Sequence, residues 1–503
     1  MSAPSVSDSA DGLLLTLDIG TSSTRAAPFR AEDGTPFRDI FHAVTHEPTT
    51  TPDGGSMLDP EGLLREAIEC LQSVLARVGD RPIVGVAVST LWHSVLGTDA
   101  AGRPQTPVLV WSDTRSSAQV AGLKARCDVD AYVQRTGCPL HTSYLPGRLL
   151  HLAETEPATF AACARFLSPG EYVFARLFGI DRVTCSYSMA SASGLFHQAE
   201  GRWDDETLAR IPGLTADRFS PVSDAPVSGL LPEWRTLLPA LADVPFLPAL
   251  GDGACSNAGC GAVRPDRLAL MIGTSGAMRV MVPGATPPQV PNGLWRYQLD
   301  RDSFLLGGAL TNGGAVWSWL KETVLLPPLP SDELQKPLAA LPPDGHGLTV
   351  LPFLSGERAP LWRDDLRAVI HGLSAATTPL EIVRAHLEAV AIRFAILRDA
   401  LRPVAPTAEI IGTGAGLLSS RAWAQIIADV LGEPIRLSAE RQASARGAAL
   451  VFREKLGLGP VGDAPMAAIT DTVLPDLRAH GIYREARTRH ERLLERLGDF
   501  DRT

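Results

Sequence analysis

One tetrapeptide occurs twice in this chain, about half its length apart, and each copy follows a short apolar run. Residues 13–17 lead into Ile-Gly-Thr-Ser at residues 19–22, and residues 268–271 lead into the same tetrapeptide at 272–275. An apolar run indicates a β-strand, and a glycine followed by hydroxyl residues indicates a tight turn. Both copies then return to apolar sequence, so each predicts a strand–turn–strand unit. Repetition of such a unit predicts two similar domains.

Each of these turns has residues that suit a phosphate group, because a tight turn exposes backbone N–H groups and hydroxyls on one side. Two such turns facing each other across a cleft would bind a polyphosphate from both sides. Asp18 precedes the first turn and could hold Mg²⁺ through water, since this ion favours one or two carboxylates plus phosphate oxygens. Met271 takes that place before the second turn, so metal binding falls to the first domain. Either turn alone would also fit an ordinary hairpin.

Length and charge narrow the classes of protein to consider. The 503 residues are enough for two sizeable domains, and the apolar fraction of 45% and charged fraction of 20% are ordinary for a globular protein. The net charge of −10, without a basic run, argues against a nucleic-acid partner. Since no apolar stretch approaches the roughly 20 residues that span a bilayer, we expect no membrane association.

The amino terminus and the cysteines bear on location. Residues 1–12 are small and polar, are expected to form a disordered tail, and lack the basic and apolar segments of a secretory signal. The seven cysteines show no paired CxxC spacing, which is typical of reduced thiols. Both features favour a cytoplasmic protein.

Two polar segments of the first half follow apolar runs and are candidates for substrate binding. Residues 83–88 predict a buried strand, and His93 and Ser94 follow its carboxyl end, where open α/β sheets bind ligands. The alternative is a histidine in a solvent-facing loop. Trp111 and Asp113 could offer a sugar an apolar platform and hydrogen bonds. A surface ion pair beside a core tryptophan is equally consistent with this second segment.

Asp252 lies between two glycines, directly after the apolar residues 246–250. Glycine lets the backbone approach a ligand closely, and a buried aspartate there could accept a proton from an attacking hydroxyl. A calcium-loop fragment or a plain turn would look the same. The position of Asp252 between the two copies of the repeat favours the catalytic interpretation.

The second half contains a pattern that suits a nucleotide. Residues 409–411 predict a strand, residues 412–416 form a glycine-rich turn, and Ser419 and Ser420 then open a helix. The pattern fits neither a Walker A loop nor a Rossmann fingerprint. Residues 457–503 are charged and predict peripheral helices.

Several motifs follow one another in an order that resembles the FGGY family of carbohydrate kinases, within the actin–hexokinase ATPase superfamily. They are DIGTSSTR at 18–25, WSDTR at 111–115, GDG at 251–253, IGTS at 272–275, TNGG at 311–314, GERAP at 356–360 and the glycine-rich turn at 412–416. The resemblance extends from about residue 13 to about residue 456. It implies an α/β fold of two ribonuclease H-like domains with a cleft between them, residues 13–253 binding the sugar and residues 254–456 binding the nucleotide. It also makes a homodimer possible.

The resemblance further implies roles for individual residues, with ATP and Mg²⁺ as cofactors. Asp252 is the expected catalytic base, and Asp18 and Asp252 are the expected metal ligands. The residues expected to contact the sugar are Trp92, His93, Ser94, Trp111, Asp113, Tyr144 and Asp252. Those expected to contact the nucleotide and its phosphates are Thr21, Ser22, Ser23, Arg25, Gly273, Thr274, Ser275, Gly313, Gly314, Gly414, Gly416 and Ser420.

The sugar is indicated by two local similarities. His93-Ser94 and residues 137–152 resemble the gluconokinases of the family, so we expect phosphorylation of D-gluconate at its primary hydroxyl. A gluconate carboxylate needs a cation, and Arg148 is a candidate. The alternatives are a xylulokinase or another ketopentose or polyol kinase, and, from another class, a non-catalytic sugar sensor or scaffold of the same fold. Arg148, His151 and His386 depart from the family signatures, where lysine, tryptophan and a small or aliphatic residue are usual.

Overall fold

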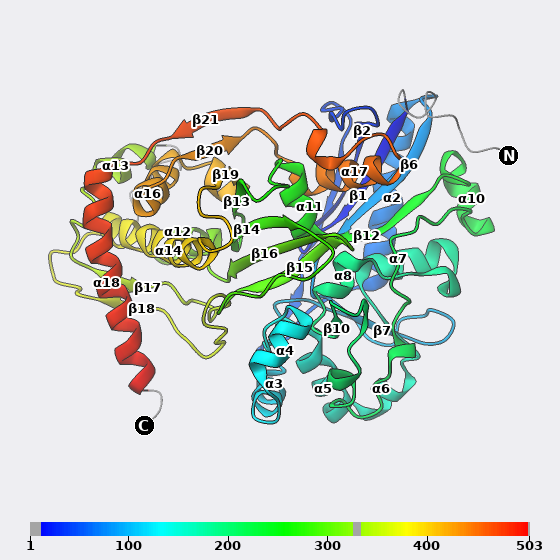
Figure 1. The fold of residues 1–503 in the computed structure, drawn as a ribbon, viewed down its shortest axis with the longest axis horizontal. Coiled ribbons are helices and arrows are strands. Elements are labelled where there is room, and N and C mark those ends of the chain that lie inside the picture. Colours follow the sequence, from blue (N-terminus) through cyan, green and yellow to red (C-terminus); the bar gives the residue numbers. More distant parts are fainter. Residues whose placement is uncertain (1–11, 325–332, 501–503) are drawn as a thin grey trace.

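The computed structural model describes residues 12–324 and 333–500, and in it two α/β domains lie on either side of a cleft (Figure 1). Of the expected disordered tail, residues 1–11 lie outside the described residues. Each domain is built on a mixed sheet that begins with one copy of the repeated strand–turn–strand unit.

The first sheet has five strands in the order β12-β6-β1-β2-β3. β1 (Leu13–Ile19) pairs antiparallel with β2 (Ser23–Arg30), which in turn pairs antiparallel with β3 (His42–Thr45). On the other side of β1, β6 (Ile83–Thr90) and then β12 (Phe246–Gly251) run parallel to it. All seven residues of β1 are buried, which is the physical reason for its continuous apolar run.

The second sheet repeats this arrangement with seven strands in the order β15-β16-β14-β13-β19-β20-β21. β13 (Arg267–Ile272) pairs antiparallel with β14 (Gly276–Pro283) and parallel with β19 (Glu409–Thr413). The remaining strands are β15 (Trp295–Asp300), β16 (Ser303–Leu310), β20 (Ile435–Ser438) and β21 (Ile469–Val473). The two-domain α/β fold expected from the repeat is therefore confirmed.

Helices cover both sheets, and their starts follow local rules. α2 (Pro60–Val78) begins where the Asp59 side chain accepts a hydrogen bond from the Glu61 N–H and proline occupies the first turn. In the second domain the helices are α12 (Gly314–Thr323), α13 (Gln335–Ala340), α14 (Pro379–Leu401), α15 (Ala415–Leu418) and α16 (Arg421–Leu431). The short strands β17 (Thr349–Leu351) and β18 (Val369–His371) pair with each other there.

Two helices cross with their backbones in direct contact, because each has a glycine at the crossing point. α11 (Asp252–Gly259) follows β12, and α17 (Ala443–Lys455) comes from near the end of the chain. A Cβ on Gly447 would lie 1.8 Å from the carbonyl oxygen of Cys255, and one on Gly259 would lie 1.8 Å from that of Ala443. Phe452 of α17 also contacts Gly85 of β6, so a helix from the second half packs on the first sheet.

The first domain also contains a series of smaller strands and helices. They are β4 (Thr49–Thr50), β5 (Ser56–Leu58), β7 (Leu96–Thr98), β8 (Val108–Leu109), β9 (Arg165–Leu167), β10 (Phe196–His197), β11 (Arg202–Trp203), α3 (Ser117–Lys124), α4 (Val129–Thr136), α5 (Leu145–Thr155), α6 (Pro157–Ala162), α7 (Pro169–Phe178), α8 (Tyr187–Ser191), α9 (Asp205–Leu208) and α10 (Pro232–Leu237).

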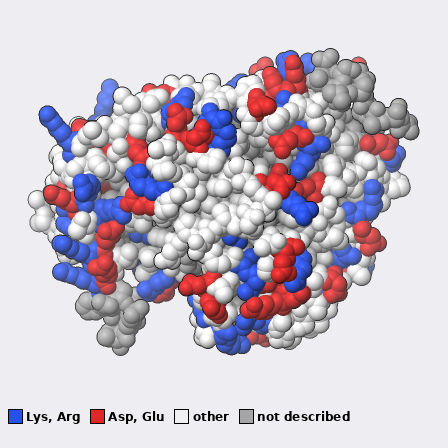
Figure 2. All heavy atoms as spheres, viewed as in Figure 1, with Lys and Arg blue, Asp and Glu red and all other residues white. Residues whose placement is uncertain are grey.

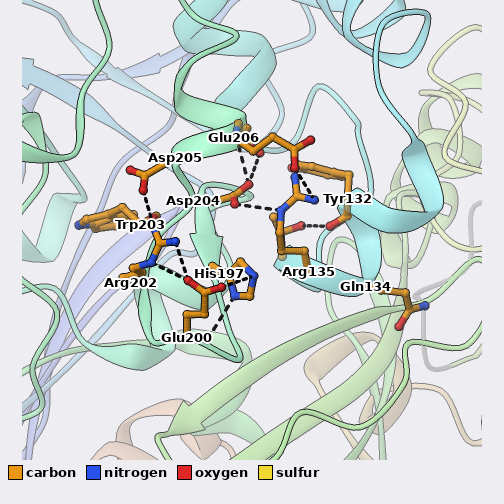
Figure 3. Close-up of polar contacts among 12 residues, drawn as sticks. Tyr132, Gln134, Arg135, His197, Glu200, Arg202, Trp203, Asp204, Asp205 and Glu206 are labelled. Atoms are coloured by element: carbon orange, nitrogen blue, oxygen red, sulfur yellow. Dashed lines mark hydrogen bonds and ion pairs between the residues drawn. The ribbon is translucent and has the colours of Figure 1, made fainter.

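Ion pairs fix α4 to the start of α9, directly after β11 (Figure 3). Arg135 of α4 contacts Asp204 at 2.9 Å and Glu206 at 3.0 Å. On the same helix, the Gln134 side chain donates to the Val290 carbonyl and accepts from the Val290 N–H, both at 3.0 Å. α4 therefore links the insertions of the first domain to the second domain.

The end of the chain differs from the expectation of peripheral helices at 457–503. Residues 469–473 form β21, which extends the second sheet, and α18 (Leu477–Phe500) buries Tyr483 against Arg384 and Glu388 of α14. β21 is an edge strand with three exposed residues, so its sequence has no apolar run that would indicate a strand.

The visible surface carries both signs of charge. Figure 2 shows basic and acidic side chains interspersed over this face of the molecule. Within residues 12–324 and 333–500, none of the helices is both long enough and apolar enough to cross a membrane.

Candidate active site

A cavity of about 460 Å³ lies between the two domains, and both copies of the repeated turn face it. The first turn contributes Gly20, Thr21 and Ser22, and the second contributes Gly273, Thr274 and Ser275. In each turn the glycine N–H donates to a serine carbonyl at 2.9 Å, from Gly20 to Ser23 and from Gly273 to Ser275. The two turns differ by one residue in length, since Ile19 pairs with Thr24 whereas Ile272 pairs with Gly276, and the tertiary structure brings both to one cavity.

Around the first turn, side chains hold one another in place. The Trp111 indole N–H donates to the Thr21 hydroxyl at 3.1 Å. Arg25 lines the cavity and donates from Nε to the Ser23 hydroxyl at 2.8 Å. Ser23 is buried and does not line the cavity, so in this structure its recorded role is to accept the hydrogen bond from Arg25.

Two acidic side chains lie in the cavity, Asp18 at the end of β1 and Asp252 at the start of α11. Burial raises the pKa of Asp252 to about 6, with Arg279 opposing the shift and Asp18 adding to it. Burial also raises the pKa of Asp18, and the charge of Arg25 opposes that shift. Two desolvated carboxylates together fit a hard cation such as Mg²⁺, and Asp252 has a pKa that suits a general base.

Aromatic side chains from both domains form the other part of the cavity wall. Trp92, His93, Trp111 and Tyr144 come from the first domain, and Trp295, Tyr297 and Trp362 come from the second. The rings of Trp295 and Tyr297 stack in parallel, with centroids 3.9 Å apart. The hydroxyls of Tyr144 and Tyr297 are 2.5 Å apart, so a hydrogen bond joins the two domains at this wall. Such a lining suits a sugar, which presents apolar C–H faces and polar edges.

His93 is held in an unusual conformation and in one protonation state. Its backbone φ is +57°, a region that side-chain-bearing residues seldom occupy and that is common at functional sites. Nδ1 lies 2.7 Å from the Ala192 carbonyl oxygen, and since a carbonyl can only accept, Nδ1 carries the hydrogen. Burial lowers the pKa of His93 to about 3. The neutral ring therefore leaves Nε2 as an acceptor for a substrate hydroxyl.

Three residues considered for the sugar or its carboxylate lie outside this cavity. Ser94 donates to the Trp92 carbonyl at 3.2 Å, and Asp113 pairs with Arg115 at 2.6 Å. Arg148 donates to the Leu109 carbonyl at 2.9 Å and the Val110 carbonyl at 3.1 Å, and also to the carbonyls of His93 and Ser143. Because its N–H groups already bond four carbonyls, Arg148 supports the His93 loop and does not provide the expected cation for a carboxylate.

A second cavity of about 730 Å³ adjoins the first, since Gly273 and Thr274 line both. Gly314, Gly416 and Ser420 line it as expected for a nucleotide site. Gly313 and Gly414 do not line this cavity, but both pack against the second turn. A Cβ on Gly313 would lie 2.4 Å from the Ser275 carbonyl carbon, and a Cβ on Gly414 would lie 2.4 Å from the Ile272 carbonyl oxygen. Ala415 and Ser419, from the pattern that suits a nucleotide, also line it, together with residues to which sequence reasoning assigned no role: Trp317, Ser318, Lys321, Gln335, Leu387 and Trp423.

Among the residues that line the first cavity, sequence reasoning assigned no role to Arg279, Trp295, Tyr297, Arg358, Trp362 and Ser444. A signal existed for two of them. Arg279 lies two positions after Ala277 in the strand that follows the second turn. Side chains two positions apart point to the same face of a strand, so both face the cleft. Arg358 lies in the GERAP motif, which resembles the family but to which the sequence analysis assigned no position in the site.

Comparisons with known proteins agree with this geometry. A model of the N-terminal domain of the FGGY family of carbohydrate kinases matches residues 13–259, and a model of its C-terminal domain matches residues 268–452. The gluconokinase of Bacillus licheniformis is 26% identical over 498 residues, which cover 96% of this chain and 94% of that protein.

Two solved structures superpose on nearly the whole chain. Gluconate kinase from Lactobacillus acidophilus has a TM-score of 0.88 at 23% identity, covering 97% of this chain and 100% of that one. Xylulose kinase from the same organism has a TM-score of 0.89 at 23% identity, covering 97% and 98%. Since the two superpose equally well, the fold does not distinguish between their sugars.

Proposed function

Because this chain belongs to the FGGY family of carbohydrate kinases, we propose that it transfers the γ-phosphoryl group of ATP to the primary hydroxyl of D-gluconate, forming 6-phospho-D-gluconate. The observation that carries this proposal is the position of Asp252. Its carboxylate lies in the cavity that also contains both phosphate-binding turns and the aromatic sugar-binding wall.

The two adjoining cavities suggest how the substrates are arranged. Adenosine occupies the cavity beside α12 and α16, and the phosphates pass over Gly273 and Thr274 toward the first turn. Asp18 and Asp252 offer the carboxylate oxygens that Mg²⁺ prefers, and an ion held there would neutralise phosphate charge. The sugar lies against Trp92, Tyr144 and Trp295.

In the reaction, Asp252 holds the primary hydroxyl and accepts its proton as the hydroxyl oxygen attacks the γ-phosphorus. The bond from the γ-phosphorus to the bridging oxygen breaks, and ADP leaves. Positioning and charge stabilisation contribute most of the rate in phosphoryl transfer. Closure of the two domains on the substrates would exclude water that would otherwise hydrolyse ATP.

Gluconate is favoured over a neutral sugar by two observations. The gluconokinase relative aligns over almost the entire chain, and the sugar side of the cavity contains buried guanidinium groups, from Arg279 and Arg358. A xylulokinase is the second candidate, favoured by the superposition on xylulose kinase. The non-catalytic alternative is disfavoured because Asp18, Thr274 and Asp252 all face the same cleft.

The test is ADP release from Mg·ATP with D-gluconate, D-xylulose, D-ribulose, glycerol or no sugar, with Asp252→Asn as the control for contaminating kinases. We expect release with D-gluconate at a rate far above the others, because it alone carries a carboxylate. Release with D-xylulose in place of D-gluconate would keep the kinase and reject the sugar acid. A silent panel with both proteins folded would favour the non-catalytic alternative.

A further inference from the structure

Two arginine side chains are buried in the sugar-binding part of the cleft. Arg279 on β14 is 6% exposed, and Arg358, in the segment between β17 and β18, is 8% exposed. Both line the cavity, and neither belongs to a phosphate-binding turn. Buried arginines are normally paired with carboxylates, because an uncompensated buried charge is costly. The surroundings of these two therefore indicate what the cavity binds.

Arg358 has no carboxylate partner among the described residues. Its Nη2 donates to the Leu310 carbonyl at 3.1 Å, its Nε has no hydrogen-bond partner, and its guanidinium lies 4.7 Å from the centre of the Trp111 ring. The neighbouring Glu357 pairs with Arg393 at 3.2 Å instead. Trp111 supplies stacking, but it leaves the positive charge uncompensated.

Arg279 is only partly compensated. Its nearest recorded contact is Nη1 to the Gly253 carbonyl at 3.5 Å, and its Nε is unpartnered within the part of the chain that the structure describes. Burial lowers the pKa of Arg279, and the attraction of Asp252 opposes that shift. Asp252 is also the proposed base and metal ligand, so it cannot serve as a dedicated partner for Arg279.

Small residues leave room for a ligand beside Arg279. Ala277 and Ala309 line the cavity next to it, and Gly307 lies opposite it across the sheet, where a Cβ would come within 3.1 Å of the Arg279 Cγ. Arg358 lies near the same part of the cavity. Burial is the main reason for the low pKa of His93, and the charge of Arg358 lowers that pKa further. The neutral His93 can accept from a hydroxyl but cannot pair with an anion.

We propose that Arg279 and Arg358 together bind the carboxylate of the substrate and so select sugar acids over neutral sugars. The inference rests on the proposed function and names the group that gives it specificity. Guanidinium N–H groups match the two oxygens of a carboxylate, and such charge-assisted hydrogen bonds are stronger than neutral ones. The substrate carboxylate then supplies the missing negative charge in the cleft.

The experiment compares two substrates that differ only in this group: D-gluconate, and D-glucitol, in which a hydroxymethyl group replaces the carboxylate. In Arg279→Met and Arg358→Met, we expect kcat/KM for D-gluconate to fall about 10–100-fold, in line with the loss of hydrogen bonds to a charged group. The ratio of kcat/KM for D-gluconate to that for D-glucitol should therefore fall, because any effect on Asp252 is common to both substrates, while KM for ATP should stay within about 3-fold. Arg279→Lys and Arg358→Lys should recover part of the loss.

A binding measurement without turnover accompanies the kinetics. D-gluconate, but not D-glucitol, should raise the thermal midpoint of the wild-type protein, because a ligand that binds the folded state stabilises it. Each methionine variant should lose this shift while keeping the shift caused by ADP, which also shows that the variant is folded.

Three outcomes would overturn the inference. The first is an equal loss of kcat/KM with both substrates in the methionine variants, and the second is a loss of the ADP-induced thermal shift or a rise in KM for ATP in those variants. The third is a wild-type protein whose thermal midpoint D-gluconate does not raise. The first two would assign the arginines to the phosphates. A wild-type protein that D-gluconate stabilises but that does not phosphorylate it would reject the proposed function alone.

Discussion

At the scale of the residue, Asp252 shows how burial prepares a group for chemistry. An exposed aspartate is a weak base at neutral pH, but the desolvated Asp252 has a pKa of about 6, closer to the working range of a general base. Its neighbour Asp18 contributes repulsion and Arg279 contributes attraction, so the value reflects three charges that the fold brings together.

We predict that Asp252→Asn lowers kcat at least about 100-fold, the usual contribution of a general base, while ADP still binds. The variant should also be more stable than the wild type by about 1–2 kcal/mol at pH 7, because it removes a buried charge. Denaturant unfolding from pH 4 to pH 8 checks the second effect.

The pH dependence of this stability difference has a definite sign. The folded-state pKa of about 6 lies above the ordinary aspartate pKa of 3.8, so the folded protein binds the proton more tightly than the unfolded chain. The Asp252 carboxylate therefore destabilises the wild type increasingly as pH rises from about 4 to about 6, and by a constant amount above that. A stability difference independent of pH, or near-normal turnover, would contradict the assignment.

At the scale of the element, α11 and α17 show why some packing cannot be seen in a linear sequence. Their backbones touch at Gly259 and Gly447, which lie far apart in the chain. By contrast, the β1–β2 hairpin and the starts of α2 and α16 are local, and the residues that form them are contiguous. Local elements were therefore predictable, while this helix contact and the polar edge strand β21 were not.

We predict that Gly447→Ala destabilises the protein by about 1–3 kcal/mol, because the new methyl would collide with the Cys255 carbonyl and backbone cannot move aside easily. The matched control is Gly481→Ala in α18, where no atom of the described chain lies within 4 Å of the added carbon. That change should stabilise by about 0.5–1 kcal/mol through helix propensity. If Gly447→Ala and Gly481→Ala changed the thermal midpoint equally, the close contact of α11 and α17 would not matter for stability.

At the scale of the whole molecule, one segment of the second domain contacts the first domain beside the aromatic wall of the cavity. Asp364 pairs with His141 at 2.7 Å and accepts from Thr142 at 2.9 Å, next to Arg358 and Trp362 in sequence. Burial alone would raise the pKa of Asp364, but the hydrogen bonds from His141 and Thr142 hold it below its usual value. The ionised carboxylate thus joins the two domains beside the cavity.

We predict that Asp364→Asn raises KM for the sugar about 5–10-fold with KM for ATP unchanged, because one charge-assisted contact across the domains is weakened. Asp365→Asn is the control, since Asp365 is exposed and pairs with Arg363 on the surface. A similar rise in both variants, or a change in KM for ATP, would show that the cross-domain contact does not order the sugar site.

The sequence by itself determined the repeated strand–turn–strand unit, the acids Asp18 and Asp252 beside it, and the family, because these depend on neighbouring residues. Only the tertiary structure decided which polar residues share the cleft. It brought Arg279 from β14 and Arg358 from a distant segment to one cavity, and it directed Arg148 and Asp113 to partners elsewhere. The physical reason is that the direction of a side chain follows from local backbone geometry, whereas its partner depends on packing between segments far apart in the chain.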